Sequence, residues 1–237
     1  MHLYRNCCST VHLCWFAIVS LWTSTANGSH FTSRAFLDRA TGIATSLETS
    51  NIPSHSKLSA WLTNEKSSTI ANKIFQEYPT WLCQGGITLG LFRAESYLYD
   101  RNKHGVRVHD RVFGINVITF GQPTTSSLQL KWQNNNSSTA TTKLVLPIVG
   151  GCLARKPTNT GSGSGCLQFI LQTSSVGEAR IETGIAGNYF PTLVGRPPVI
   201  PIRAWVYRST QSMVHSYIMW RFHQYCYHQG GGELKIK

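Results

Sequence analysis

A long helix-forming segment near the C-terminus constrains the fold of this chain most strongly. It runs from Ile202 to about His228, with Pro201 where the first helical turn tolerates proline and Gly230–Gly232 after its end. Apolar side chains recur in it at steps of three and four residues, which predicts packing on another layer of the fold. An amphipathic helix on a membrane surface is the alternative. The residues of this largely apolar face of the helix are Ile202, Trp205, Val206, Ser209, Met213, Tyr217, Ile218, Trp220, Phe222 and Tyr225.

Strand-like segments precede this helix. Leu128, Leu130 and Trp132 alternate with polar residues, which is typical of an antiparallel strand with one exposed face. The segment Cys166–Thr173 alternates in the same way, and Val106–Phe120 is rich in β-forming residues. Short turns separate these segments, so we expect a meander of about five to seven strands.

One helix is predicted ahead of these strands, from Asn64 to Tyr78. Ile70 and Ile74 recur at helical spacing, and Pro79 is expected to end the helix. Strands followed by one long closing helix predict an α+β fold, in which that helix packs on a curved antiparallel sheet. A lipocalin-like β-barrel with a terminal helix is the second choice.

The first 28 residues have the three-part layout of a secretory signal peptide. Arg5 precedes the uncharged, mostly apolar run Cys7–Trp22, and Ala26 and Gly28 suit a peptidase site. The run is shorter than the roughly 20 residues of a membrane span, and a single N-terminal anchor is the alternative. We therefore expect the chain to enter the secretory pathway.

Residues 29–60 are predicted to be a transit-like or disordered segment, because they hold 11 Ser and Thr but only two acidic residues. Gly28-Ser29-His30-Phe31 and Ser33-Arg34-Ala35-Phe36 resemble the small-residue-then-Phe junction of bipartite presequences. The resemblance implies the plastid of an alga with complex plastids, and secretion or the ER lumen is the alternative. A single domain is then expected over 61–229, with a flexible tail at 230–237.

The chain is basic, with 22 Lys and Arg against 10 Asp and Glu, and most of the excess lies after residue 60. Such a field favours anionic partners, for example lipid headgroups or acidic proteins. No run of Lys and Arg exceeds two residues, so a nucleic-acid surface is not predicted.

The cysteines beyond the N-terminal segment form no C-x-x-C pair, and no histidine or cysteine spacing predicts a metal site or cofactor. Cys152 and Cys166 are equidistant from Asn159, so a simple hairpin would place them face to face. They are expected to form either a disulfide or two buried free thiols. Asn135 and Asn136 each begin an N-glycosylation acceptor pattern in a polar loop.

Three side chains are candidate acids or bases, namely His109, Asp110 and His215. No catalytic motif connects them, and surface or capping roles are the alternative. Arg196 and Arg203 flank a proline-rich connection and are candidates for contact with an anionic head group.

The order of a helix, a bent antiparallel sheet and a long C-terminal helix over residues 64–228 resembles the START/Bet v 1-like superfamily. The resemblance implies a curved sheet that grips the long helix around an apolar cavity. Members of that superfamily bind lipids, sterols or polyketides, and a minority are cyclases.

The leading functional hypothesis is therefore the binding or carrying of a small apolar ligand such as a lipid, pigment or polyketide-like molecule. One alternative is an enzyme of the cyclase or hydrolase type acting on such a ligand, and another is a basic module that binds anionic membrane or protein surfaces. The candidate cavity-facing residues, which would equally line an ordinary core, are Leu167, Phe169, Leu171, Tyr189, Phe190, Met213, Tyr217 and Trp220.

Overall fold

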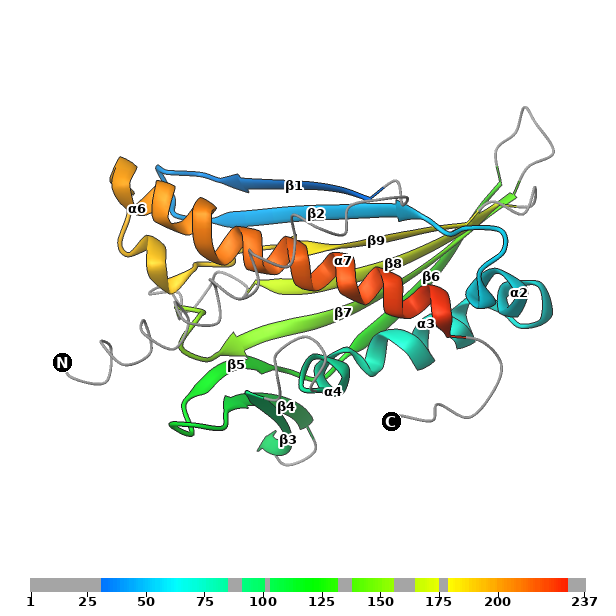
Figure 1. The fold of residues 1–237 in the computed structure, drawn as a ribbon, viewed down its shortest axis with the longest axis horizontal. Coiled ribbons are helices and arrows are strands. Elements are labelled where there is room, and N and C mark those ends of the chain that lie inside the picture. Colours follow the sequence, from blue (N-terminus) through cyan, green and yellow to red (C-terminus); the bar gives the residue numbers. More distant parts are fainter. Residues whose placement is uncertain are drawn as a thin grey trace.

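The computed structural model describes residues 31–84, 91–100, 103–131, 138–155, 165–174 and 179–229. They form an α+β fold in which one antiparallel sheet carries a long C-terminal helix on one face, as the sequence predicts (Figure 1). The strands within these ranges are β1 (Thr32–Leu37), β2 (Ala44–Asn51), β3 (Phe92–Asp100), β4 (Lys103–Asp110), β5 (Asn116–Phe120), β6 (Thr124–Lys131), β7 (Ser138–Gly150), β8 (Cys166–Ser174) and β9 (Ala179–Ala186).

The sheet is open, with strand order β1-β2-β9-β8-β7-β5-β4-β3 and β6 paired to β7. Because β1 and β3 lie at its two edges, the alternative prediction of a closed lipocalin-like barrel is wrong. The described part of the sheet has nine strands, more than the five to seven expected. One added boundary falls inside Val106–Phe120, where a turn separates β4 from β5.

Two of the added strands, β1 and β2, lie in the segment predicted to be transit-like or disordered. β1 pairs with β2 from Thr32↔Thr49 to Leu37↔Ala44, and β2 pairs with β9. The hairpin turn is held by Asp38, whose carboxylate accepts from the Ala40 amide at 2.9 Å and the Thr41 hydroxyl at 2.6 Å. The folded domain therefore begins well before residue 61. Six of the eleven Ser and Thr residues that favoured disorder are strand residues here, namely Thr32, Ser33, Thr45, Ser46, Thr49 and Ser50.

Three short helices connect β2 to β3: α2 (Lys57–Asn64), α3 (Ser67–Gln76) and α4 (Tyr78–Leu82). The predicted helix over Asn64–Tyr78 is thus confined to α3. Pro79 does not simply end it, because it lies in the first turn of α4. Proline is tolerated there, since the amides of the first turn have no partner within the helix.

The C-terminal helix consists of α6 (Pro201–Tyr207), a π-helical turn η2 (Arg208–Ser212) and α7 (Met213–His228). The turn coincides with hydroxyl side chains that compete for backbone carbonyls. Ser209 donates to the Trp205 carbonyl at 2.8 Å, and Thr210 donates to the Val206 carbonyl at 2.5 Å. Such side-chain bonds commonly disturb a regular helix.

An aromatic core joins α7 to the middle of the sheet. Phe222 of α7 lies 5.5 Å from Phe169 of β8 and 4.9 Å from Trp81 of α4, between ring centroids. Phe75 of α3 stacks on Phe169 at 5.2 Å. We call Phe75, Tyr78, Trp81, Phe169 and Phe222 the aromatic core, and all five are buried.

Candidate functional site

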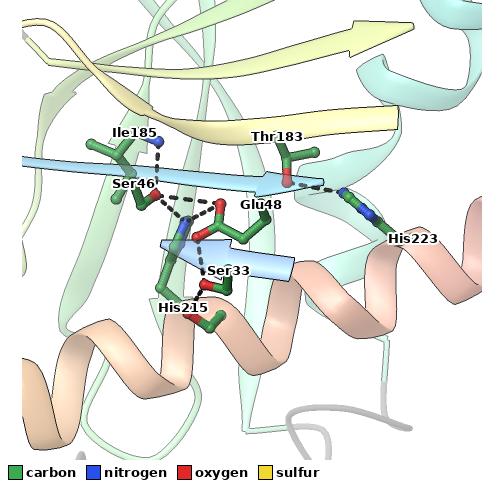
Figure 2. A network of polar contacts seen from close by, with 8 residues as sticks. Ser33, Ser46, Glu48, Thr183, Ile185, His215 and His223 are labelled. Carbon is green, nitrogen blue, oxygen red and sulfur yellow. Dashed lines mark hydrogen bonds and ion pairs between the residues drawn. The ribbon is translucent and has the colours of Figure 1, made fainter. Parts of the chain in front are cut away.

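A second set of contacts joins the same helix to the edge of the sheet, and it is polar. It lies between β1, β2 and β9 on one side and α7 on the other (Figure 2). We call it the polar seam, and it consists of Ser33, Ser46, Glu48, Ser50, Thr183, His215, Ser216, His223 and Tyr227.

Local structure explains why these residues meet. Side chains of a strand alternate between its two faces, so Ser46, Glu48 and Ser50 of β2 all point toward α7. The strand register places Ser33 opposite Glu48, and Glu48 opposite Thr183. His215 and His223 lie about two helical turns apart and face this row.

Glu48 is the centre of the seam and is completely buried, with 0% exposure. The Ser33 hydroxyl donates to its Oε1 at 3.4 Å, and the Ser46 hydroxyl donates to its Oε2 at 3.4 Å. His215 Nε2 also lies 3.4 Å from Oε2. These contacts are long beside the roughly 2.5–2.9 Å of good charge-assisted hydrogen bonds. The carboxylate therefore keeps capacity to accept a stronger donor.

His215 connects this buried carboxylate with the outside, because its side chain is 16% exposed. Its Nε2 lies 3.0 Å from the Ser46 hydroxyl as well as 3.4 Å from Glu48. The Ser46 hydroxyl and the Glu48 carboxylate thus contact the same nitrogen of the His215 ring. In a Ser-His-Asp triad the serine and the carboxylate contact opposite ring nitrogens, so the seam is not a nucleophilic triad. It is an arrangement that places one imidazole nitrogen beside a serine hydroxyl and a buried carboxylate.

His223 has a different environment from His215, although both belong to α7. It is fully buried, with Nδ1 2.6 Å from the Ser50 hydroxyl and Nε2 3.0 Å from the Thr183 hydroxyl. Tyr227 donates to Ser50, so a neutral ring with its proton on Nε2 completes the chain of hydrogen bonds. Burial lowers the pKa of His223 to about 3. This histidine is therefore a neutral structural residue.

The charge of Glu48 affects the pKa of two buried tyrosines. Burial is the main cause that raises the pKa of Tyr78 and of Tyr207, and the negative charge of Glu48 raises both further. Tyr189 lies nearby in the fold, where its hydroxyl donates to the Leu153 carbonyl at 3.0 Å and accepts from the Gln211 amide at 2.6 Å. The Oε1 atom of Gln211 is buried without a partner.

The predicted ligand-binding residues occupy several environments. Leu167, Phe169 and Leu171 are buried on the helix-facing side of β8, where Phe169 belongs to the aromatic core. Tyr189 and Tyr217 are also buried. Three of the other predicted residues are half-buried: Phe190, Met213 and Trp220. The last two, Arg196 and Arg203, are exposed.

The structure separates the three acid–base candidates. The Asp110 carboxylate accepts from the backbone amides of Val112, Phe113 and Ile115 at 3.0, 2.7 and 2.7 Å, so it holds the turn between β4 and β5. His109 lies beside Glu95 of the edge strand β3, at 3.3 Å. Both are near the edge of the sheet opposite to His215. Only His215 contacts a buried carboxylate.

The prediction that Cys152 and Cys166 face each other across a hairpin is wrong. Cys166 pairs with Pro147 across β7 and β8, whereas the Cys152 amide donates to the Asn116 carbonyl at 2.8 Å. No disulfide joins the two thiols in the structure. Asn135 and Asn136 lie outside the described residues. Within the described ranges, no group of three or more His, Cys, Asp or Glu side chains is placed to hold a metal ion.

Sequence reasoning missed Glu48, the residue at the centre of the site. Ser46, Glu48 and Ser50 form a period-two row, but they lie in a segment assigned to disorder from its composition. The alternation of small polar residues around a single carboxylate was the available signal.

Comparison with known proteins adds no relative: no family model matches the sequence, and no curated protein matches it. The side chains of the seam therefore carry the functional inference.

Proposed function

We propose that the protein binds a small molecule with an apolar body and a hydrogen-bond-donating end, and that Glu48 and His215 receive this end. The observation that carries the proposal is the complete burial of Glu48 with partners no closer than 3.4 Å. A buried carboxylate costs stability unless it is well paired, so an incompletely paired one favours a role beyond packing.

The charge of Glu48 defines the polar end of the ligand. An amine or a hydroxyl group can donate to the carboxylate, whereas a carboxylate or phosphate group would be repelled by it. The side chains next to the seam indicate that the rest of the ligand is apolar. These side chains lie between the sheet and the helix and are all apolar: Leu167, Phe169, Ile181 and Met219. The preceding turn η2 is π-helical, a feature frequent at functional sites.

The architecture agrees with this ligand class. One helix, an antiparallel sheet and a long C-terminal helix is the order that suggested an apolar carrier from the sequence, and the structure has three short helices in place of the one. Binding between the helix and the edge strands would use the polar seam for the donating end of the ligand, and its apolar end would reach Phe169 at the border of the aromatic core.

Three probes with one alkyl chain test the proposal: octylamine, 1-octanol and octanoate. Isothermal titration of the full chain is expected to show binding of the amine and the alcohol but not of octanoate. The preference would oppose the net charge of +12, which by itself attracts the anion. Glu48→Gln should abolish the preference for the amine over octanoate.

Glu182→Gln is the matched control, because Glu182 is a strand carboxylate that pairs with Arg180 at 3.1 Å instead of facing α7. It should leave the preference unchanged. Equal binding of all three probes, or binding that Glu48→Gln does not alter, would contradict the proposal.

The second candidate function is an enzyme in which His215 transfers a proton on the bound molecule and Glu48 holds the ring. The contact of a partly exposed imidazole with a buried carboxylate is the observation that favours it. Mass spectrometry of ligand extracted from the wild type and from His215→Gln, produced in the same host, tests it. An enzyme predicts different recovered molecules, and a carrier predicts the same molecule in both.

A further inference from the structure

A cluster of exposed apolar side chains lies at the start of the C-terminal helix, and the proposed ligand site does not use it. Ile200, Ile202 and Trp205 are 52%, 65% and 66% exposed. They fall within six consecutive residues, whereas large apolar side chains on a protein surface are ordinarily scattered. The opposite side of the same helical segment packs against the fold, because Ala204 and Tyr207 are buried.

Arginines surround this apolar cluster. Arg196, Arg203 and Arg208 are exposed on the same segment, and Arg39 joins them from the β1–β2 turn. Arg39 is fixed there by two bonds to Val199: its Nε donates to the Val199 carbonyl at 3.1 Å, and its own carbonyl accepts from the Val199 amide at 2.7 Å. We call Arg39, Arg196, Ile200, Ile202, Arg203, Trp205 and Arg208 the terminal patch. It lies at one end of the molecule, where Figure 1 shows α6.

No member of the terminal patch is acidic. No Asp or Glu occurs between Glu182 and Glu233 in the sequence. Asp38, next to Arg39 in the chain, bonds to the Thr41 hydroxyl and the Ala40 amide, which lower the pKa of its carboxyl group; it therefore stays ionised, and the arginines of the patch outnumber it. Arg155 adds a further positive charge, because its Nη1 donates to the Gly195 carbonyl at 2.8 Å.

We propose that the terminal patch docks the protein onto an anionic lipid membrane, with Trp205 and the two isoleucines in the interface and the arginines at the headgroups. Tryptophan favours the boundary between water and lipid, and exposed aliphatic side chains gain free energy by entering it. Arginine near an anionic leaflet adds electrostatic attraction. A second copy of this chain fits poorly, since self-association through the patch would bring arginine against arginine.

None of the helices in the described part of the chain has the length and hydropathy that a transmembrane helix needs. The proposed docking is instead a surface attachment by one short amphipathic segment. It is independent of the ligand site, because the polar seam lies on the inner side of α7 and the patch on the outer side of α6.

Flotation of the full chain with vesicles tests the proposal, using phosphatidylcholine alone and phosphatidylcholine with 30 mol% phosphatidylserine as the probes. We expect binding to the anionic vesicles that weakens as salt is raised, and much weaker binding to the neutral vesicles. Arg203→Gln with Arg208→Gln should lower binding to anionic vesicles about tenfold. Ile202→Ser with Trp205→Ser should lower it by a similar factor.

Val112→Ser with Phe113→Ser is the matched control, since these side chains are 60% and 55% exposed but lie in the turn between β4 and β5. This pair should bind like the wild type. Circular dichroism melting of each variant, with unchanged midpoints, shows that folding is retained. Equal binding to neutral and anionic vesicles, or full binding by both patch variants, would overturn the proposal. A patch-dependent dimer in light scattering without vesicle binding would also overturn it and identify a second copy as the occupant.

Discussion

The aromatic core and the polar seam lie under the same helix, α7, and differ in how they hold it. One cross-strand row runs through both, in the order Ser33, Glu48, Thr183, Phe169 and Leu144. At Phe169 the row is closed by rings, Phe75 stacked on it and Phe222 edge-on to it, whereas at Glu48 it is closed by hydroxyls and an imidazole whose contacts of 3.4 Å are long for hydrogen bonds to a carboxylate. Rings alone would have sufficed to attach a helix to a sheet. The polar end therefore holds the helix by contacts of a different kind, and the proposed ligand site rests on that difference.

The two histidines of α7 repeat this contrast within the seam itself. His223 is fully buried and bonded at both nitrogens, while His215 is partly exposed and shares one nitrogen between a serine and a carboxylate. His223 belongs to the structure of the fold. His215 and Glu48 are the pair to which we assign the proposed ligand.

The largest expected effect is the loss of an aromatic-core ring. Phe222→Ala should lower the free energy of unfolding by about 3–5 kcal/mol, because it removes a buried ring and leaves a cavity between α7, β8 and α4. Urea denaturation followed by circular dichroism measures this. Trp220→Ala, on the same helix but only half-buried, should cost markedly less. Equal costs would mean that the core does not anchor the helix.

An acid-dependent loss of stability should come next. The folded-state pKa of His223, about 3, lies below the roughly 6.5 of an exposed histidine, so the unfolded chain takes up a proton first as the pH falls. Its contribution is complete above pH ~6.5 and decreases by about 3 kcal/mol by pH ~4.5. His223→Gln should flatten this slope of unfolding free energy against pH, and His55→Gln, an exposed histidine, should not. An unchanged slope in His223→Gln would show that His223 is not the group responsible.

The smallest expected change in stability belongs to Glu48→Gln. The amide keeps the shape of the side chain and removes the desolvation cost of a buried charge, so the free energy of unfolding should stay within about 1 kcal/mol of the wild type. Thermal and urea denaturation at pH 7 measure it. A loss as large as that of Phe222→Ala would mean that the seam is structural and would remove the distinction between the two regions.

Local patterns in the sequence predict the parts of the fold that depend on neighbouring residues. The three-to-four spacing after Pro201 predicts the closing helix, and the alternation in Cys166–Thr173 predicts β8. Composition was a poor guide to residues 29–60, because Ser and Thr fit both a disordered segment and a strand whose inner face is hydrogen-bonded. Strands β1 and β2 were missed for that reason.

The candidate site was predictable only in part. His215 stands among the candidate bases because it lies on the helix, but its partner Glu48 is 167 positions earlier in the chain. Glu48 lies in β2, and β2 comes to lie under α7 because it pairs with β9. A local sequence pattern does not predict such long-range strand pairing. The same limit applies to Cys152 and Cys166, whose symmetric spacing suggested a facing that the register of β7 and β8 does not produce.

Nuclear magnetic resonance of the ¹⁵N-labelled histidine rings during titration with octylamine tests most directly whether the seam is a binding site. We expect the Nε2 resonance of His215, assigned by its loss in His215→Gln, to shift in a saturable way in the wild type and not in Glu48→Gln, while His223 changes little. Binding of octylamine without a shift of His215, or an identical shift in Glu48→Gln, would contradict the assignment of Glu48 and His215 as the polar end of a ligand site.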